Sequence, residues 1–219
     1  MTGDRVPVKI LTLRLIANLS PELARGLGLG PEYKSVGLIS TDSDDATYIA
    51  LDEATKRAAV DVVYAKSFYA GAPNATTKLA GEVIGVLGGP NPSEVTAGLQ
   101  GAAEFLRDSV GFRTANEEGD IVYLAHTVSR AGSYLSKLAK VGRGEAVAYL
   151  IAPPVEAVVA LDAALKAADV RLTELFPPPS ETNFAGGLLT GAQSACKAAC
   201  DAFAEAVIRV ANSPLDMGG

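Results

Sequence analysis

The pattern of apolar and polar positions in the first half of the chain returns about 110 residues later in the second half. Residues 50–60 (ALDEATKRAAV) and 160–170 (ALDAALKAADV) match at seven of eleven positions. In both copies an apolar run of strand length precedes this stretch and another follows it. Each copy then continues through a loop rich in Gly, Pro, Asn and Thr, an Ala-Gly pair and a long Ala-rich helix. The chain is therefore predicted to be a tandem duplication of one α/β unit.

Periodicity predicts the elements of the first unit. Apolar alternation over 6–19 predicts a strand, and Ser20 followed by Pro21 predicts the cap and first turn of a short helix. We further expect a strand over 33–41, a helix over 46–59, strands over 60–66 and 79–87, and a helix over 92–107. The loop 67–78 is long for a compact domain, and such loops often carry function.

The second unit is predicted to repeat this order. Residues 109–120 form a polar connection, 121–128 a strand, and 129–135 lead into a short helix. One stripe is predicted to be the buried face of the last helix: Leu189, Ala192, Cys196, Ala199, Phe203, Ala206 and Val210. Each unit thus has the order β, short α, then β-α-β-β-α. This order predicts an α+β, ferredoxin-like layer with mixed parallel and antiparallel strands and two helices on one face, in domains covering 1–110 and 111–219.

Composition and charge narrow the class of protein. At 219 residues with 48% hydrophobic content, the chain is long enough for two domains with apolar cores. A net charge of −6 argues against nucleic-acid and anionic-membrane partners. No leader opens the chain, and no apolar run approaches the roughly 18 residues that span a bilayer. Cys196 and Cys200 stand one helical turn apart, which favours a buried, reduced pair and a cytosolic setting.

Five stretches spread over nearly the whole chain carry a family resemblance. They are 42–56 (DSDDATYIALDEATK), 88–92 (GGPNP), 128–136 (VSRAGSYLS), 177–184 (PPPSETNF) and 195–203 (ACKAACDAF). The chain resembles the bacterial microcompartment shell proteins, and within them the tandem-domain group of ethanolamine utilisation. The resemblance implies two circularly permuted microcompartment (BMC) domains and a homotrimer that looks hexagonal. It also implies packing with other shell proteins into the shell of a bacterial microcompartment in the cytoplasm.

The resemblance further implies two kinds of pore. A small pore through each subunit would bind a short amine such as ethanolamine through Asp44, Asp45, Glu82, Phe112 and Thr182. Carboxylates with a hydroxyl and an aromatic face suit an ammonium alcohol. A central pore would be gated by loops that include Phe68, Tyr69, Gly71, Asn74, Pro178, Ser180, Asn183 and Phe184.

Other interpretations remain open at this point. The acidic cluster at Asp42, Asp44 and Asp45 also suits the capping of the following helix, where the helix dipole favours negative charge. A tandem-domain sensor that binds a small molecule is the alternative function, and an enzyme using the same carboxylates is a third. We expect no enzyme, cofactor or metal site, because His126 is the only histidine and no nucleophile–base pair stands out.

Overall fold

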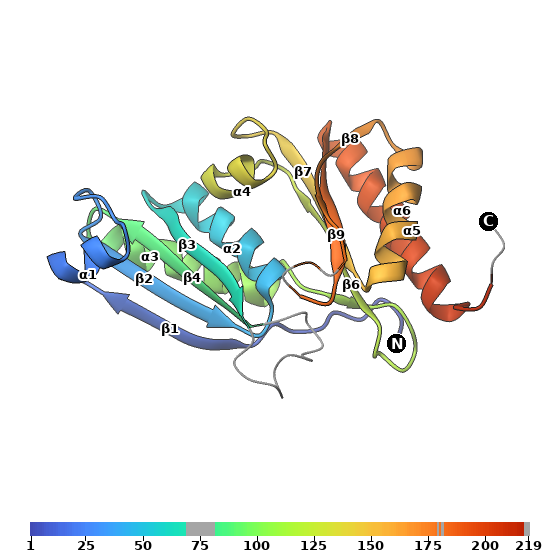
Figure 1. Cartoon of the computed structure of the whole chain (residues 1–219), viewed down its shortest axis with the longest axis horizontal. Coiled ribbons are helices and arrows are strands. Elements are labelled where there is room, and N and C mark those ends of the chain that lie inside the picture. The colour runs from blue at the N-terminus through green and yellow to red at the C-terminus, as the bar shows by residue number, and fades with distance from the viewer. Residues whose placement is uncertain (69–81, 179, 181, 217–219) are drawn as a thin grey trace.

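The computed structural model describes residues 1–68, 82–178, 180 and 182–216. The elements of the first half are β1 (Ile10–Ile16), α1 (Pro21–Gly26), β2 (Ser35–Thr41), α2 (Asp44–Arg57), β3 (Asp61–Phe68), β4 (Glu82–Gly89) and α3 (Pro92–Asp108). Those of the second half are β5 (Arg113–Thr114), β6 (Val122–Val128), α4 (Ser133–Leu138), β7 (Ala146–Ala152), α5 (Pro154–Ala167), β8 (Val170–Phe176), β9 (Ala185–Gly191) and α6 (Gln193–Asn212). Figure 1 shows the two halves side by side, each with its own sheet.

The two sheets have equivalent strand orders, β1-β2-β4-β3 and β5-β6-β7-β9-β8. Every strand pair in the described part of the chain is antiparallel, so the predicted mixture of parallel and antiparallel pairing is wrong. The physical reason is the strand order. β2 and β3 point the same way across the α2 connection, but β4 lies between them and pairs with both.

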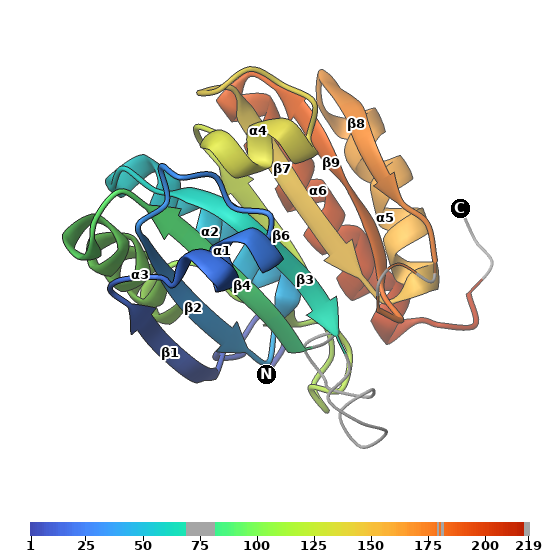
Figure 2. The ribbon, with the colours of Figure 1, turned by 60° about the vertical axis from the view of Figure 1, so that its left-hand side comes forward.

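Helices cover both faces of each sheet. Figure 2 shows the short helices α1 and α4 in front of the sheets and the long helices behind them. The long helices approach closely because the facing strands carry small residues: a Cβ on Gly85 would lie only 2.6 Å from Leu51 Cδ1.

Capping residues that can be recognised in the sequence explain where two of the helices begin. Ser20 Oγ accepts from the backbone N–H of Leu23 at 3.2 Å, and Asn91 Oδ1 accepts from that of Glu94 at 3.0 Å.

One apolar cluster spans the two halves, and the second half has a further large cluster of its own. A single buried cluster contains Ile39 and Leu87 of the first sheet together with Val147 and Tyr149 of the second. The N-terminal segment adds a hydrogen-bonded connection, because Val6 N of the first half donates to Phe112 O beside β5 at 2.8 Å. The halves are therefore two repeats of one unit joined by a shared apolar cluster.

Several predicted boundaries need correction. The helix expected over 46–59 begins at Asp44, so the acidic residues belong to its first turn. β3 continues through Phe68, two residues into the segment expected as a loop. Leu189 lies in β9 and not on the last helix, which begins at Gln193. The cysteines are free and buried, as the spacing predicted.

Candidate functional site

The first turn of α2 places two carboxylates at a cavity of about 390 Å³ between the halves. Asp44 is 3% exposed and Asp45 8% exposed. The rest of the wall is largely aromatic and aliphatic: Tyr48 of α2, Ala65 of β3, Tyr134 and Leu138 of α4, Tyr149 and Ile151 of β7, Phe176 of β8, and Ser180. Such a volume and such walls, with a few convergent polar groups, are typical of a small-molecule site.

Hydroxyl groups hold both carboxylates. Ser67 Oγ donates to Asp44 Oδ2 at 2.7 Å, and Tyr149 OH donates to Asp45 Oδ1 at 2.8 Å. Burial raises the pKa of Asp44 to about 6, although the hydrogen bond from Ser67 opposes the shift. Burial, followed by the charge of Asp45, raises the pKa of Tyr149 well above its usual range. Tyr149 therefore remains a hydrogen-bond donor at neutral pH.

Of the other residues expected at the small pore, Glu82 and Thr182 are connected to the cavity by hydrogen bonds, whereas Phe112 lies in the apolar core. Glu82 opens β4, and its backbone carbonyl is 3.4 Å from Ser67 Oγ, the hydroxyl that reaches Asp44. Thr182 Oγ1 lies 3.3 Å from Ser180 Oγ, which lines the cavity. Phe112 is fully buried, and its ring meets that of Phe184 edge-on with centroids 5.9 Å apart. Thr182 is thus next to a residue of the cavity wall, and the backbone of Glu82 is connected to the wall residue Asp44 through Ser67.

The residues expected at the central pore are only partly described. Tyr69, Gly71 and Asn74 lie outside the described residues. Phe68 ends β3 with 38% of its surface exposed. Pro178 and Asn183 are exposed, whereas Ser180 faces the cavity and Phe184 is buried.

Sequence reasoning missed the aromatic walls of the cavity. Tyr48 stands one helical turn after the acidic pair, which places it on the same side of α2. Tyr149 sits in the middle of an apolar strand, where its hydroxyl needs a buried partner. Neither signal identifies the partner, because Asp45 and Tyr149 are 104 residues apart in the sequence.

Comparison with known proteins decides the family. The model of the BMC domain matches residues 35–115 and 151–215, one match in each half. The chain belongs to the BMC-domain family of bacterial microcompartment shell proteins. The shell protein EutL of Clostridium perfringens is 63% identical over 98% of this chain and 99% of its own length, and that of Escherichia coli is 51% identical over 97% of both. The crystal structure of the ethanolamine utilization protein EutL from Leptotrichia buccalis matches with a TM-score of 0.93 and 60% identity, over 99% of this chain and 100% of that one.

These matches confirm two BMC domains in tandem and a shell protein of the EutL type. The family is one of structural shell proteins. The boundary expected between the two domains, after residue 110, stays a prediction.

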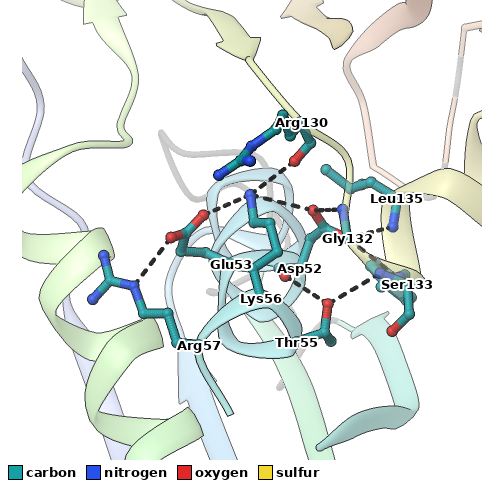
Figure 3. Close-up of polar contacts among 10 residues, drawn as sticks. Asp52, Glu53, Thr55, Lys56, Arg57, Arg130, Gly132, Ser133 and Leu135 are labelled. Carbon is teal, nitrogen blue, oxygen red and sulfur yellow. Dashed lines mark hydrogen bonds and ion pairs between the residues drawn. The ribbon is translucent and has the colours of Figure 1, made fainter. Parts of the chain in front are cut away.

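A second polar cluster, shown in Figure 3, connects the two BMC domains by hydrogen bonds between α2 and the start of α4. Asp52 of α2 is fully buried and accepts backbone N–H groups at the start of α4: Gly132 and Leu135 at 2.8 Å each, and Tyr134 at 3.2 Å. Beside it, Thr55 Oγ1 accepts from Ser133 N at 3.1 Å. An aspartate from one domain thus satisfies the free donors at the helix start of the other.

Among the described residues, no three His, Cys, Asp or Glu side chains gather in an arrangement that could hold a metal ion. Burial lowers the pKa of His126 to about 4, and its ring packs edge-on against Phe105. Across the same residues, no helix has both the length and the apolar character to cross a membrane.

Proposed function

We propose that this chain is a tile of the shell of an ethanolamine-utilisation microcompartment. Three chains would close a ring of six BMC domains, with domains covering 1–110 and 111–219, and these tiles would pack beside other shell proteins. The observation that carries the proposal is the tandem repeat, supported by high identity to EutL shell proteins over the full chain. A closed ring of six equivalent domains needs only three chains when each chain supplies two.

Electron microscopy of the purified protein tests this function. A shell tile should form extended sheets with hexagonal packing, made of particles with three times the 22.5 kDa chain mass. Single particles of one chain that never form sheets would contradict the tile and favour the alternative, a small-molecule sensor. The observation that favours this alternative is the cavity between the domains, which has the size of a small-molecule site.

A second part of the proposal concerns the small site. We propose that Asp44 and Asp45 bind a short ammonium alcohol, with ethanolamine as the first candidate, and that Glu82, Phe112 and Thr182 complete the site. No Lys or Arg is among the described residues that line the cavity, so its charge is negative or neutral. A carboxylate about 4 Å from an ammonium group contributes about 4 kcal/mol at an effective dielectric constant of 20, before desolvation.

Titration calorimetry with ethanolamine tests this site. Glu82→Gln should weaken binding, because the substitution removes the charge of a residue whose backbone adjoins Ser67, the partner of Asp44, and keeps the size of the side chain. Glu205→Gln, on the exposed side of α6, is the matched control and should bind as the wild type does. Equal affinity in wild type and Glu82→Gln would remove Glu82 from the site.

The third part concerns a central pore, for which the support is the family resemblance. The loops 67–78 and 175–184 occupy equivalent places in the two repeats, so three copies of each would converge on the trimer axis and gate the pore. Ser180 and Thr182 lie on one of these loops and beside the cavity, which would couple the small site to the gate. A ligand shifts such a gate only if it binds the open and closed states unequally. Crystal structures with and without ethanolamine test the coupling, and identical loop positions in both would contradict it.

A further inference from the structure

Two adjoining hollows form a groove along β6. One has a volume of about 420 Å³ and lies between α2, α3 and β6. The other has a volume of about 800 Å³ and lies between β6 and α6. Thr127 and Ser129 line both, so the two hollows are continuous, and together they are called the β6 groove. The residues that line it are all different from those that line the cavity at Asp44 and Asp45.

The β6 groove is positively charged, whereas the whole chain has a net charge of −6. Two carboxylates line it, those of Glu53 and Asp201. Five cationic side chains also line it: Lys56, Arg57, Arg113, Arg130 and Lys197. Five cations against two carboxylates leave an excess of three positive charges. A concave surface with an excess of one sign of charge attracts ligands of the opposite sign.

Two of the arginines have no acidic partner among the described residues. The guanidinium of Arg113 donates to the backbone carbonyl of Gly3 at 2.9 Å, which satisfies one donor and does not balance the charge. Arg130 is exposed, and its backbone carbonyl accepts from Lys56 Nζ at 3.1 Å. A guanidinium presents its N–H groups as a planar fork that matches the oxygens of phosphate or carboxylate, so these two arginines can each take an anionic ligand.

Glu53 positions the other two cations at the same end of the groove. Its side chain is 19% exposed and lies 2.5 Å from Lys56 Nζ and 3.0 Å from Arg57 Nε. Burial acts to raise the pKa of Glu53, but the hydrogen bonds from Lys56 and Arg57 outweigh burial and lower it, so this carboxylate is ionised at neutral pH. In Figure 3 the side chain of Arg130 lies beside this group. One negative charge therefore stands among three positive charges, and two of the three are held in place.

The repeated unit does not require this charged cluster in order to fold. At the 110-residue offset of the repeat, Ala163 and Ala167 of α5 stand in the places of Glu53 and Arg57 of α2. The two helices nevertheless have equal lengths of 14 residues. The charges are thus a feature of the groove and not of the helix that carries them.

Apolar side chains form part of the wall at the same end of the groove. Ile49 and Phe105 line it together with Arg130. The ring of Phe105 meets that of His126 edge-on, with centroids 5.7 Å apart, and His126 is uncharged at neutral pH. A hollow of about 420 Å³ has the volume of a site for an organic molecule rather than for a bare oxyanion. A ligand in it would contact cations and an aromatic ring together.

We propose that the β6 groove binds an organic phosphate of about the size of a nucleotide. The phosphate lies against Arg130 and Lys56, and the organic part lies against Phe105 and extends along β6 toward Arg113. Arginine and lysine supply the charge-assisted hydrogen bonds that phosphate oxygens accept, and an aromatic ring offers a surface on which a planar base can stack. The site is separate from the proposed amine site, and it requires neither ethanolamine nor a particular oligomeric state.

Titration calorimetry of the full chain with ADP at low ionic strength tests the proposal. The wild type should bind ADP, with an affinity that falls as salt is added, because salt screens the attraction between exposed charges. Arg130→Gln should weaken binding about tenfold, since it removes a charge-assisted contact to the phosphate. Arg143→Gln removes the same charge from an exposed turn outside the groove and should bind as the wild type does. Absence of ADP binding to the wild type, or equal affinity in Arg130→Gln, would overturn the proposal.

A second pair of variants places a charge where the two hollows meet. Ser129 is exposed and lines both of them, so Ser129→Glu should abolish ADP binding by repelling the phosphate. Ser129→Gln has nearly the same size without the charge and should retain most of the affinity.

Two further ligands separate the parts of the proposed molecule. Adenosine and inorganic phosphate should each bind the wild type at least about tenfold more weakly than ADP, because each lacks one half of the contacts. Adenosine binding as tightly as ADP would refute the role of the cations. Inorganic phosphate binding as tightly as ADP would show that the groove takes a bare anion only, which would overturn the organic phosphate.

Discussion

Replacing Asp44 with asparagine should change the pH dependence of stability in a defined direction. Asp44 is 3% exposed, its carboxylate accepts from Ser67 Oγ, and its pKa rises from 3.8 to about 6 in the folded protein. The folded state therefore binds a proton more tightly than the unfolded state between these values. The contribution of this group to stability is fully present below about pH 4 and is lost as the pH rises through 6.

The magnitude follows from the same shift. A rise of about two pH units in the pKa corresponds to ~3 kcal/mol, which is an upper value for the cost of keeping Asp44 ionised in the folded state. Asparagine has the same shape and no charge, so Asp44→Asn should be more stable than the wild type at pH 8 by on the order of 1–3 kcal/mol. At pH 4 the two proteins should be nearly equal.

The assay is thermal or urea unfolding of both proteins from pH 4 to pH 8 at one protein concentration. For a chain of this size the gain corresponds to a melting temperature higher by about 2–4 °C for each kcal/mol. Ethanolamine adds a second readout, because an ammonium ligand favours the ionised carboxylate and its affinity for the wild type should increase through pH 6. A stability difference that does not vary with pH, or an Asp44→Asn protein less stable at pH 8, would refute the reasoning.

Two further substitutions test the junction between the domains. Asp52→Asn should destabilise the protein by about 2–4 kcal/mol, because it removes a buried charge that accepts from three backbone N–H donors. Urea unfolding at pH 7 measures this loss of stability. A loss below about 0.5 kcal/mol would contradict the role of Asp52. Gly132→Ala should cost about 1–3 kcal/mol, since the new Cβ collides with Thr55 Oγ1 and the Asp52 backbone. Gly144→Asn is its control, at an open position with φ +86, where asparagine tolerates the left-handed backbone and should change stability little.

The tandem repeat and most helices and strands could be predicted from the sequence, because they depend on local periodicity and on capping residues such as Ser20 and Asn91. The pairing of the strands could not be predicted, since the position of β4 between β2 and β3 depends on contacts between residues that are far apart in the sequence. Asp52 and Asp162 show the same limit. They occupy the same place in the repeat, yet one is fully buried against α4 and the other is exposed in the single chain.

The candidate site, too, could be predicted from the sequence only in part. Asp44 and Asp45 stand out in the sequence as part of an acidic cluster beside a helix start. The tyrosines that enclose them come from α2, α4 and β7, and only the folded arrangement of both domains brings them together. The sequence predicts the charged part of the site, and its aromatic walls emerge from the junction between domains.

The structure of the assembled particle by cryo-electron microscopy tests the central claim most directly. The account predicts three chains in a closed ring of six domains, with first and second domains alternating. A particle in which two first domains or two second domains touch each other would contradict it.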